Sequence, residues 1–285
     1  MAPPVLYLDT NHLSALARRP DDPSSLAVRQ ILDRREATLA LSLLHLHELS
    51  APQFTDRDVV GEMLDRSPIV WAISFIELFD REVGHAFQTV TGGEAPPVVV
   101  FYSDLRHAWS APDLDIVPPI VEQLRAFANR PDLRSGFLQT ASRGVWLDGI
   151  MKTSAAVLKD PNGPILSRIK DMKLDTTQTG IVLPKPYPAE ELLKRAGGLA
   201  AFPAYNVFQQ LHRIRLGDAG FATKANDLLD EWHACYYPYA DVTALDRATV
   251  ARCKSARLPG LDRVTARLGD VPGLVAEKGC RLTRN

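Results

Sequence analysis

The first 75 residues alternate between short apolar runs and longer mixed stretches, as in proteins that layer helices on a sheet. Apolar runs at 5–8 and 37–41 are bounded by Pro4, Asp9 and Ser42, which is typical of buried parallel strands. Helices are predicted where the pattern becomes amphipathic and an N-cap residue precedes it. Their expected ranges are 12–18, 26–35, 43–49 and 56–65, and the run 69–75 fits either a strand or a buried helix.

The pattern weakens between about residues 80 and 200, where Pro-Pro and Gly-Gly pairs interrupt it, and then returns. Helices are predicted over 119–129, 189–196, 205–216 and 221–236, and a short strand over 242–245. Strands that alternate with helices favour an open parallel sheet with helices on both faces. We therefore expect an α/β core, a largely helical excursion, and a return of the chain to complete the sheet.

The net charge of -1 hides an uneven distribution of charge along the chain. Residues 247–285 contain nine Lys or Arg and three Asp or Glu, whereas the rest contains 24 basic and 31 acidic residues. A basic segment beside an acidic body fits a phosphate-binding rim next to a carboxylate site. On charge alone, a solvated basic helix explains the segment equally well.

Cysteine content and hydropathy favour a soluble cytoplasmic protein without a membrane segment. The three cysteines, Cys235, Cys253 and Cys280, show no C-x-x-C spacing, which argues against a disulfide framework and for a reducing compartment. The N-terminus has no charged segment followed by an apolar run, as a signal peptide would. No apolar run approaches the roughly 18 residues that span a bilayer.

Four acidic residues occupy positions where α/β sheets bind ligands. Asp9 directly follows the first strand and Asp246 the late strand, while Glu48 and Asp230 lie in predicted helices. Ligands of open α/β sheets bind beyond the carboxyl ends of the strands. Clustered carboxylates repel one another unless a cation separates them, and hard oxygen ligands suit Mg²⁺ or Mn²⁺. A single Asp after a strand is usually a turn residue and by itself indicates no function. It is the placement of all four acids together that indicates a metal site.

Three segments resemble, in order, the opening, second and closing blocks of the PIN-domain ribonuclease family, which includes VapC-like toxins. These segments are Leu6-Tyr7-Leu8-Asp9-Thr10-Asn11, Leu41-Ser42 through Glu48-Leu49, and Asp230-Glu231-Trp232-His233-Ala234 through Leu245-Asp246-Arg247. The resemblance covers about residues 4–75 and 220–258. It implies a three-layer α/β/α core with a central parallel sheet, built from 1–80 and 205–260. A mainly helical insertion over 81–204 and a basic extension over 261–285 complete the expected organisation.

The resemblance also implies roles for individual residues. The expected metal ligands and catalytic acids, which would hold one or two Mg²⁺ or Mn²⁺ ions, are Asp9, Glu48, Asp230 and Asp246. The positions that orient the first acid or its water are Thr10, Asn11 and Ser42. Asp227 lies one turn before Asp230 and stays an alternative third acid. Asp241 precedes a strand, so we expect it nearer the opposite edge of the sheet, although it remains a possible ligand.

The implied reaction is hydrolysis of RNA phosphodiester bonds by an activated water. Arg247, Arg252 and Lys254 closely follow the last acid, so we expect them to contact the backbone of bound RNA. Besides RNA, the partners suggested by the family are a small protein antitoxin and a second copy of the chain. Three aromatic residues could stack on bases, but we expect at least two of them to pack in the core: Tyr236, Tyr237 and Tyr239.

Competing functions are weaker but remain open. One alternative is a PIN-like module that binds RNA or a protein partner, has the same fold and does not catalyse RNA cleavage. A haloacid-dehalogenase-like phosphatase needs a second Asp two residues after the first, where this chain has Asn11. A zinc helix of the His-Glu-x-x-His type fails, because Ala51 follows His47-Glu48 at the second ligand position. His233 is expected to pack in the core or to support the site.

Overall fold

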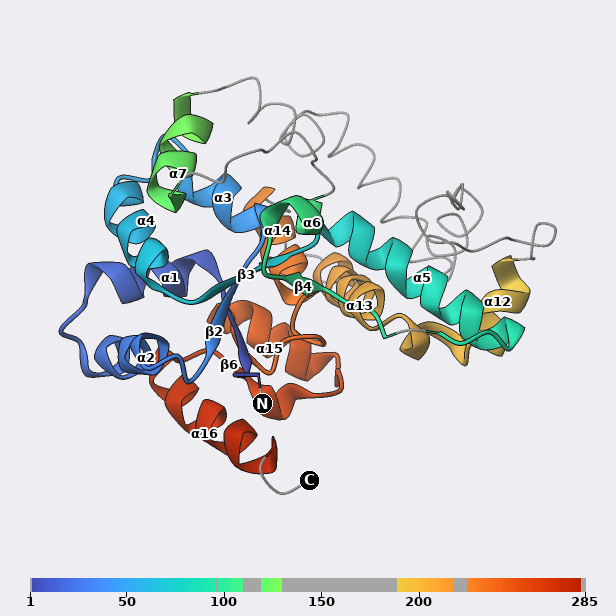
Figure 1. The fold of residues 1–285 in the computed structure, drawn as a ribbon. Coiled ribbons are helices and arrows are strands. Elements are labelled where there is room, and N and C mark those ends of the chain that lie inside the picture. Colours follow the sequence, from blue (N-terminus) through green and yellow to red (C-terminus); the bar gives the residue numbers. More distant parts are fainter. Residues whose placement is uncertain (1, 96, 110–118, 130–188, 218–224, 283–285) are drawn as a thin grey trace.

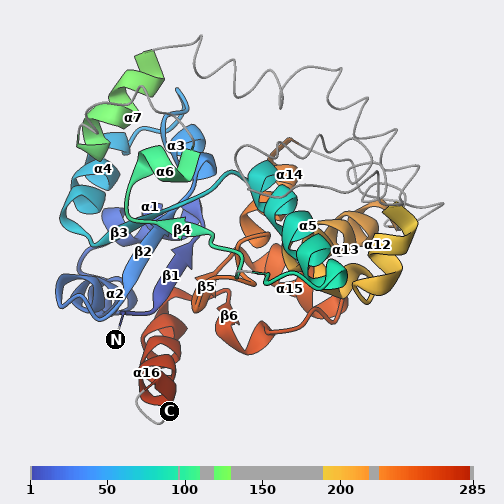
Figure 2. The same cartoon turned by 45° about the vertical axis from the view of Figure 1, so that its right-hand side comes forward.

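The centre of the structure is a six-stranded, mostly parallel sheet (Figure 1). Its strand order is β4-β3-β2-β1-β5-β6, and all six strands are labelled in Figure 2. The structure is a computed structural model, which describes residues 2–95, 97–109, 119–129, 189–217 and 225–282. The strands are β1 (Val5–Leu8), β2 (Thr38–Leu41), β3 (Ile69–Ala72), β4 (Phe101–Tyr102), β5 (Val242–Ala244) and β6 (Val264–Thr265). Among the strand pairs of the described residues, β3–β4 alone is antiparallel. The predicted α/β class and parallel central sheet are confirmed.

Helices follow the strands closely in the described parts of the chain. In the first half they are α1 (Thr10–Arg18), α2 (Pro23–Asp33), α3 (Leu43–Leu49), α4 (Arg57–Arg66), α5 (Phe75–Thr91), α6 (Leu105–Trp109) and α7 (Ile120–Asn129). In the second half they are α12 (Ala189–Arg195), α13 (Pro203–Gly217), α14 (Ala225–Ala234), α15 (Arg247–Ser255) and α16 (Val271–Leu282). Of the ambiguous run 69–75, residues 69–72 form β3, and Ser74 then caps α5 by accepting a hydrogen bond from the backbone of Glu77. The predicted helix start at 221–224 lies outside the described residues.

Helices cover both faces of the sheet, as Figure 2 shows. Side chains of successive strand residues point to opposite faces. Leu6 and Leu8 of β1 pack in one core cluster with residues of α1, α2, α4 and α16. Tyr7, between them, packs in a second cluster with residues of α5, α13 and α14. Because the middle strands are buried on both faces, they read in the sequence as continuous apolar runs.

The sheet extends into two segments where no strand was predicted. β4 lies within the expected insertion 81–204, and β6 lies within the expected extension 261–285. Each is two residues long, so neither leaves a recognisable alternation in the sequence. Residues 261–282 therefore belong to the folded core, where Val271 of α16 is completely buried.

The predicted start of the insertion does not coincide with the end of a helix or strand. Its boundary at residue 80 falls inside α5, whose apolar side packs continuously into the core and so gives the chain no break there. Most of the insertion, 110–118 and 130–188, lies outside the described residues, as do 283–285 of the extension. Among the described residues, no helix has the length and apolar character needed to cross a membrane.

Candidate functional site

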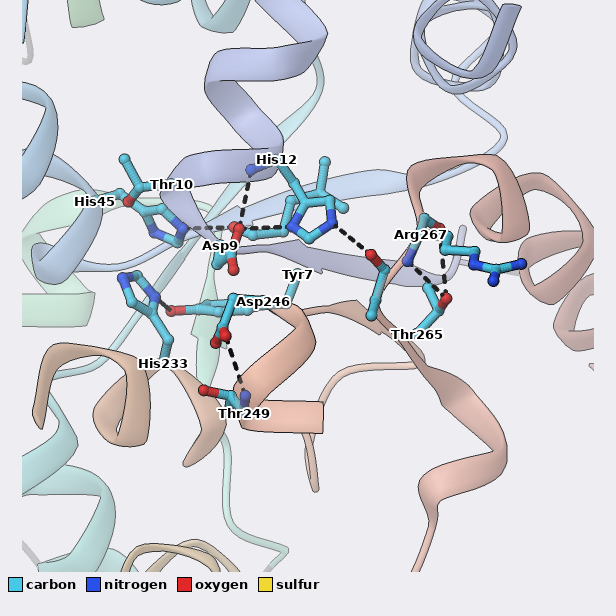
Figure 3. A network of polar contacts seen from close by, with 12 residues as sticks. Tyr7, Asp9, Thr10, His12, His45, His233, Asp246, Thr249, Thr265 and Arg267 are labelled. Carbon is cyan, nitrogen blue, oxygen red and sulfur yellow. Dashed lines mark hydrogen bonds and ion pairs between the residues drawn. The ribbon is translucent and has the colours of Figure 1, made fainter. Parts of the chain in front are cut away.

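Asp9 and Asp246 lie at the carboxyl ends of two neighbouring strands. β1 and β5 pair in parallel, and the backbone N–H of Asp9 donates to the carbonyl of Ala244 at 2.9 Å. Each aspartate caps the helix that follows it, because its Oδ1 accepts backbone N–H groups of the first turn. Asp9 accepts from His12 at 2.9 Å, and Asp246 accepts from Ala248 at 2.8 Å. The local capping preference of Asp thus places two acids at one sheet edge (Figure 3).

Glu48 reaches the same edge from α3. Its Oε2 accepts a hydrogen bond from the hydroxyl of Thr10, the residue after Asp9, and lies 2.9 Å from Nε2 of His233. Burial acts to raise the pKa of Glu48, but the charge and hydrogen bond of His233 outweigh burial and lower that pKa. Glu48 is therefore ionised and firmly held.

Asp230 on α14 joins this group of acids. Its burial, followed by the negative charge of Asp246 and a smaller contribution from Glu48, raises its pKa to about 7. Asp227, one turn earlier, interacts electrostatically with Arg215. The structure therefore brings Asp230 into the acid cluster, which we define as Asp9, Glu48, Asp230 and Asp246.

Asp241 lies at the other end of the sheet. Its Oδ2 accepts a hydrogen bond of 2.8 Å from the backbone N–H of Val5, the first residue of β1, and its own N–H donates to the carbonyl of Val5 at 2.9 Å. Asp9 follows the last residue of the same strand, so the length of β1 separates the two aspartates. Asp241 therefore links the start of β5 to the start of β1, and it does not reach the acid cluster.

Two histidines contact the acids. Nδ1 of His12 lies 2.6 Å from Asp9 Oδ1, and Nε2 of His12 lies 3.4 Å from the carbonyl of Ala266 (Figure 3). Burial alone would raise the pKa of Asp9, but the hydrogen bonds and charge of His12 lower it. His12 was not among the predicted site residues, although its i+3 spacing from Asp9, which follows the first strand, was available as a signal. His233, which was expected to pack in the core or to support the site, is buried and contacts Glu48.

The three residues expected to orient the first acid behave differently from one another. Thr10 donates to Glu48 rather than to Asp9. Ser42 contacts Tyr7 and His45 deeper in the core. Asn11 is exposed in the first turn of α1, and no hydrogen bond of its side chain occurs among the described residues. Only Thr10 therefore touches an acid of the cluster.

The basic residues expected to bind RNA lie on α15, which begins directly after Asp246. Arg247 and Lys254 are exposed. Arg252 is partly buried, donates to the hydroxyl of Thr249 at 3.0 Å, and its charge acts to lower the pKa of Asp230. Of the three, Arg252 is thus the residue whose charge acts on an acid of the cluster. Tyr236 and Tyr237 are each 1% exposed, which confirms that at least two of the three tyrosines pack in the core.

The donor atoms of the acid cluster are oxygens, the type of ligand that a hard divalent cation prefers. Among the described residues, no hydrogen bond reaches Asp9 Oδ2, Glu48 Oε1 or Asp246 Oδ2, and none reaches the carboxylate of Asp230. Each acid thus keeps an oxygen that could bind an ion, and oxygen donors suit Mg²⁺ or Mn²⁺. Within the same described residues, no three His, Cys, Asp or Glu side chains are already arranged as a metal-binding group.

Comparisons of the chain with protein-family models, with curated proteins and with solved structures give no match.

Proposed function

We propose that the protein is a PIN-like, metal-dependent ribonuclease that hydrolyses RNA phosphodiester bonds at the acid cluster. The observation that carries the proposal is the meeting of Asp9, Glu48, Asp230 and Asp246. They come from four separate elements. Asp9 and Asp246 follow neighbouring strands, Thr10 beside Asp9 donates to Glu48, and the charges of Asp246 and Glu48 act to raise the pKa of Asp230. This end is where open α/β sheets bind their ligands.

The acid cluster offers oxygen donors for a divalent cation. The four acids would provide the ligands, and the carboxylates would have to turn toward one another to enclose the ion. When bound, Mg²⁺ or Mn²⁺ supplies a water of lowered pKa and offsets negative charge on the phosphodiester. Thr10 and His233 restrain Glu48, and His12 restrains Asp9, so two of the acids are oriented before a ligand arrives.

The surroundings of the acids favour a polyanionic substrate. Arg247 and Lys254 on α15 are exposed and lie two turns apart along the helix that Asp246 begins. Cations in this position would contact the phosphates of a bound strand and orient it toward the acids. We propose RNA as the substrate because the sequence resembles PIN domains. A protein antitoxin as partner is proposed on the same resemblance.

Cleavage of single-stranded RNA by the purified full chain tests the proposal. We expect cleavage that requires Mn²⁺ and is abolished by EDTA. Asp9→Asn should reduce the rate at least about a hundredfold, because charge stabilisation of the transition state is lost. Asparagine keeps the N-cap of α1, so the helix should survive. Asp22→Asn is the matched control, since Asp22 caps α2 in the same way and is exposed.

Other outcomes would support the alternatives. RNA binding without any Mn²⁺-dependent cleavage would indicate the non-catalytic binding module. Hydrolysis of a phosphomonoester without RNA cleavage would favour the phosphatase. Equal activity of wild type and Asp9→Asn would refute the ribonuclease proposal.

A further inference from the structure

A chain of buried polar side chains runs from Glu48 into the sheet. His233 lies 2.9 Å from Glu48 through Nε2, and 2.7 Å from the hydroxyl of Tyr7 through Nδ1. That hydroxyl is 3.1 Å from Oγ of Ser42, which is itself 3.1 Å from Nδ1 of His45. Tyr7, Ser42 and His45 are completely buried, and His233 is 2% exposed. Figure 3 shows Tyr7, His45 and His233 drawn together from three different elements.

The inner end of this polar chain is fixed by backbone groups. The N–H of Ser42 donates to Nδ1 of His45 at 2.9 Å, so this ring nitrogen carries no proton. The proton is on Nε2, which donates to the carbonyl of Leu8 at 2.7 Å. Burial, followed by the charge of His233, lowers the pKa of His45 to about 3, so it stays neutral. The inner end of the polar chain is therefore anchored at the carbonyl of Leu8, the last residue of β1, next to Asp9.

The outer end of the polar chain determines how Glu48 is oriented. A carboxylate only accepts hydrogen bonds, so Nε2 of His233 donates to Glu48 in either protonation state of the ring. Thr10 donates to the same oxygen, Oε2. Two donors on one oxygen restrict rotation of the carboxylate. Oε1 then remains as the oxygen of Glu48 that can reach a ligand.

The hydroxyl of Tyr7 is not needed to fill space. The ring of Tyr7 stacks on Tyr236 with centroids 5.1 Å apart, and a phenylalanine would occupy the same volume. A buried hydroxyl is costly unless it is hydrogen-bonded. At Tyr7 it contacts Ser42 and His233, so its structural consequence is to fix the ring of His233.

We infer that Tyr7 and His233 are positioning residues, which orient Glu48 for a divalent cation through this buried chain. The inference rests on the proposed function. Neither residue contacts the substrate in this scheme: His233 acts through Glu48, and Tyr7 acts through His233. Partners that orient metal ligands typically change metal affinity 10- to 100-fold when they are removed.

Titration of the full-length protein with Mn²⁺, followed by electron paramagnetic resonance of the free ion, measures the effect without depending on RNA cleavage. Tyr7→Phe should weaken Mn²⁺ binding about 10-fold or more. Tyr236→Phe is the matched control, because its buried hydroxyl donates to the carbonyl of Ile73 at 2.8 Å and lies outside the polar chain. It should lower thermal stability to a similar extent and leave Mn²⁺ affinity unchanged.

Two substitutions of His233 separate positioning from packing. The amide of glutamine can reach the position of Nε2, whereas that of asparagine is closer to the position of Nδ1. His233→Gln should therefore keep the hydrogen bond to Glu48 and retain more Mn²⁺ affinity than His233→Asn. A role limited to packing predicts that affinity follows thermal stability in both variants.

The outcomes distinguish the inference from the proposed function. If wild type binds Mn²⁺ and Glu48→Gln does not, the site exists as proposed. If Tyr7→Phe then binds as tightly as wild type, or is weakened no more than Tyr236→Phe, the inference is overturned and the ribonuclease proposal stands. Failure of wild type to bind Mn²⁺ overturns both.

Discussion

Glu82 on α5 holds the first turn of α13, and its replacement by glutamine should change how stability depends on pH. The side chain is 1% exposed. Its Oε1 accepts from the N–H of Ala204 at 2.5 Å and from the hydroxyl of Tyr239 at 2.5 Å, and Oε2 accepts from the N–H of Tyr205 at 3.2 Å. These hydrogen bonds act to lower the pKa of Glu82, but burial outweighs them and raises it to about 7.

The direction of the pH effect follows from this raised pKa. An unfolded chain loses the proton of a glutamate near its ordinary pKa of 4.5, while the folded protein keeps it up to about pH 7. Between these values the folded state holds more protons, so stability falls by about 1.4 kcal/mol per pH unit. The contribution of the protonated Glu82 to the free energy of unfolding is fully present below pH 4.5 and lost above pH 7, and it totals about 3 kcal/mol.

Urea denaturation of wild type and Glu82→Gln at intervals between pH 4.5 and 8 measures this effect. Asp9 and Glu48 have lowered pKa values and act in the opposite direction, so the informative quantity is the difference between the two proteins. That difference should shift in favour of Glu82→Gln by about 3 kcal/mol across the range. Glu94→Gln, at an exposed glutamate, should run parallel to wild type. Parallel curves for Glu82→Gln and wild type would refute the reasoning.

Three further predictions concern packing, buried charge and the site. A Cβ at Gly61 would lie 2.7 Å from Cα of Val121, so Gly61→Ala should cost about 1–3 kcal/mol in urea denaturation, whereas Gly84→Ala, with open space, should not destabilise. Arg215→Met should cost about 3–5 kcal/mol, because the buried carboxylate of Glu231 loses its guanidinium partner, and adding Glu231→Leu should restore most of this loss; an undiminished loss in the double variant would contradict this. Asp246→Asn keeps the cap of α15, so it should retain stability while RNA cleavage falls at least about a hundredfold.

Much of the layered architecture could be predicted from the order of apolar and polar residues. The runs at 5–8 and 37–41 became β1 and β2 because middle strands are buried on both faces, which leaves a continuous apolar signature. The helix predicted over 43–49 is α3, and Ser42, which ends the preceding apolar run, is its N-cap. The two-residue strands β4 and β6 were not predicted, because only pairing with an existing sheet edge makes so short a segment a strand.

The sequence by itself determined which acids follow strands, and therefore that Asp9 and Asp246 could share one sheet edge. Only the tertiary structure decided which side chains contact the acids. His12 touches Asp9 through a local helical turn, but His233 meets Glu48 across 185 positions of sequence, and Tyr7 joins His233 across 226. Such contacts depend on which strands become neighbours and on how α14 packs over β1. Local propensity and periodicity do not predict that packing, because they describe how each segment folds and not which other segments it contacts.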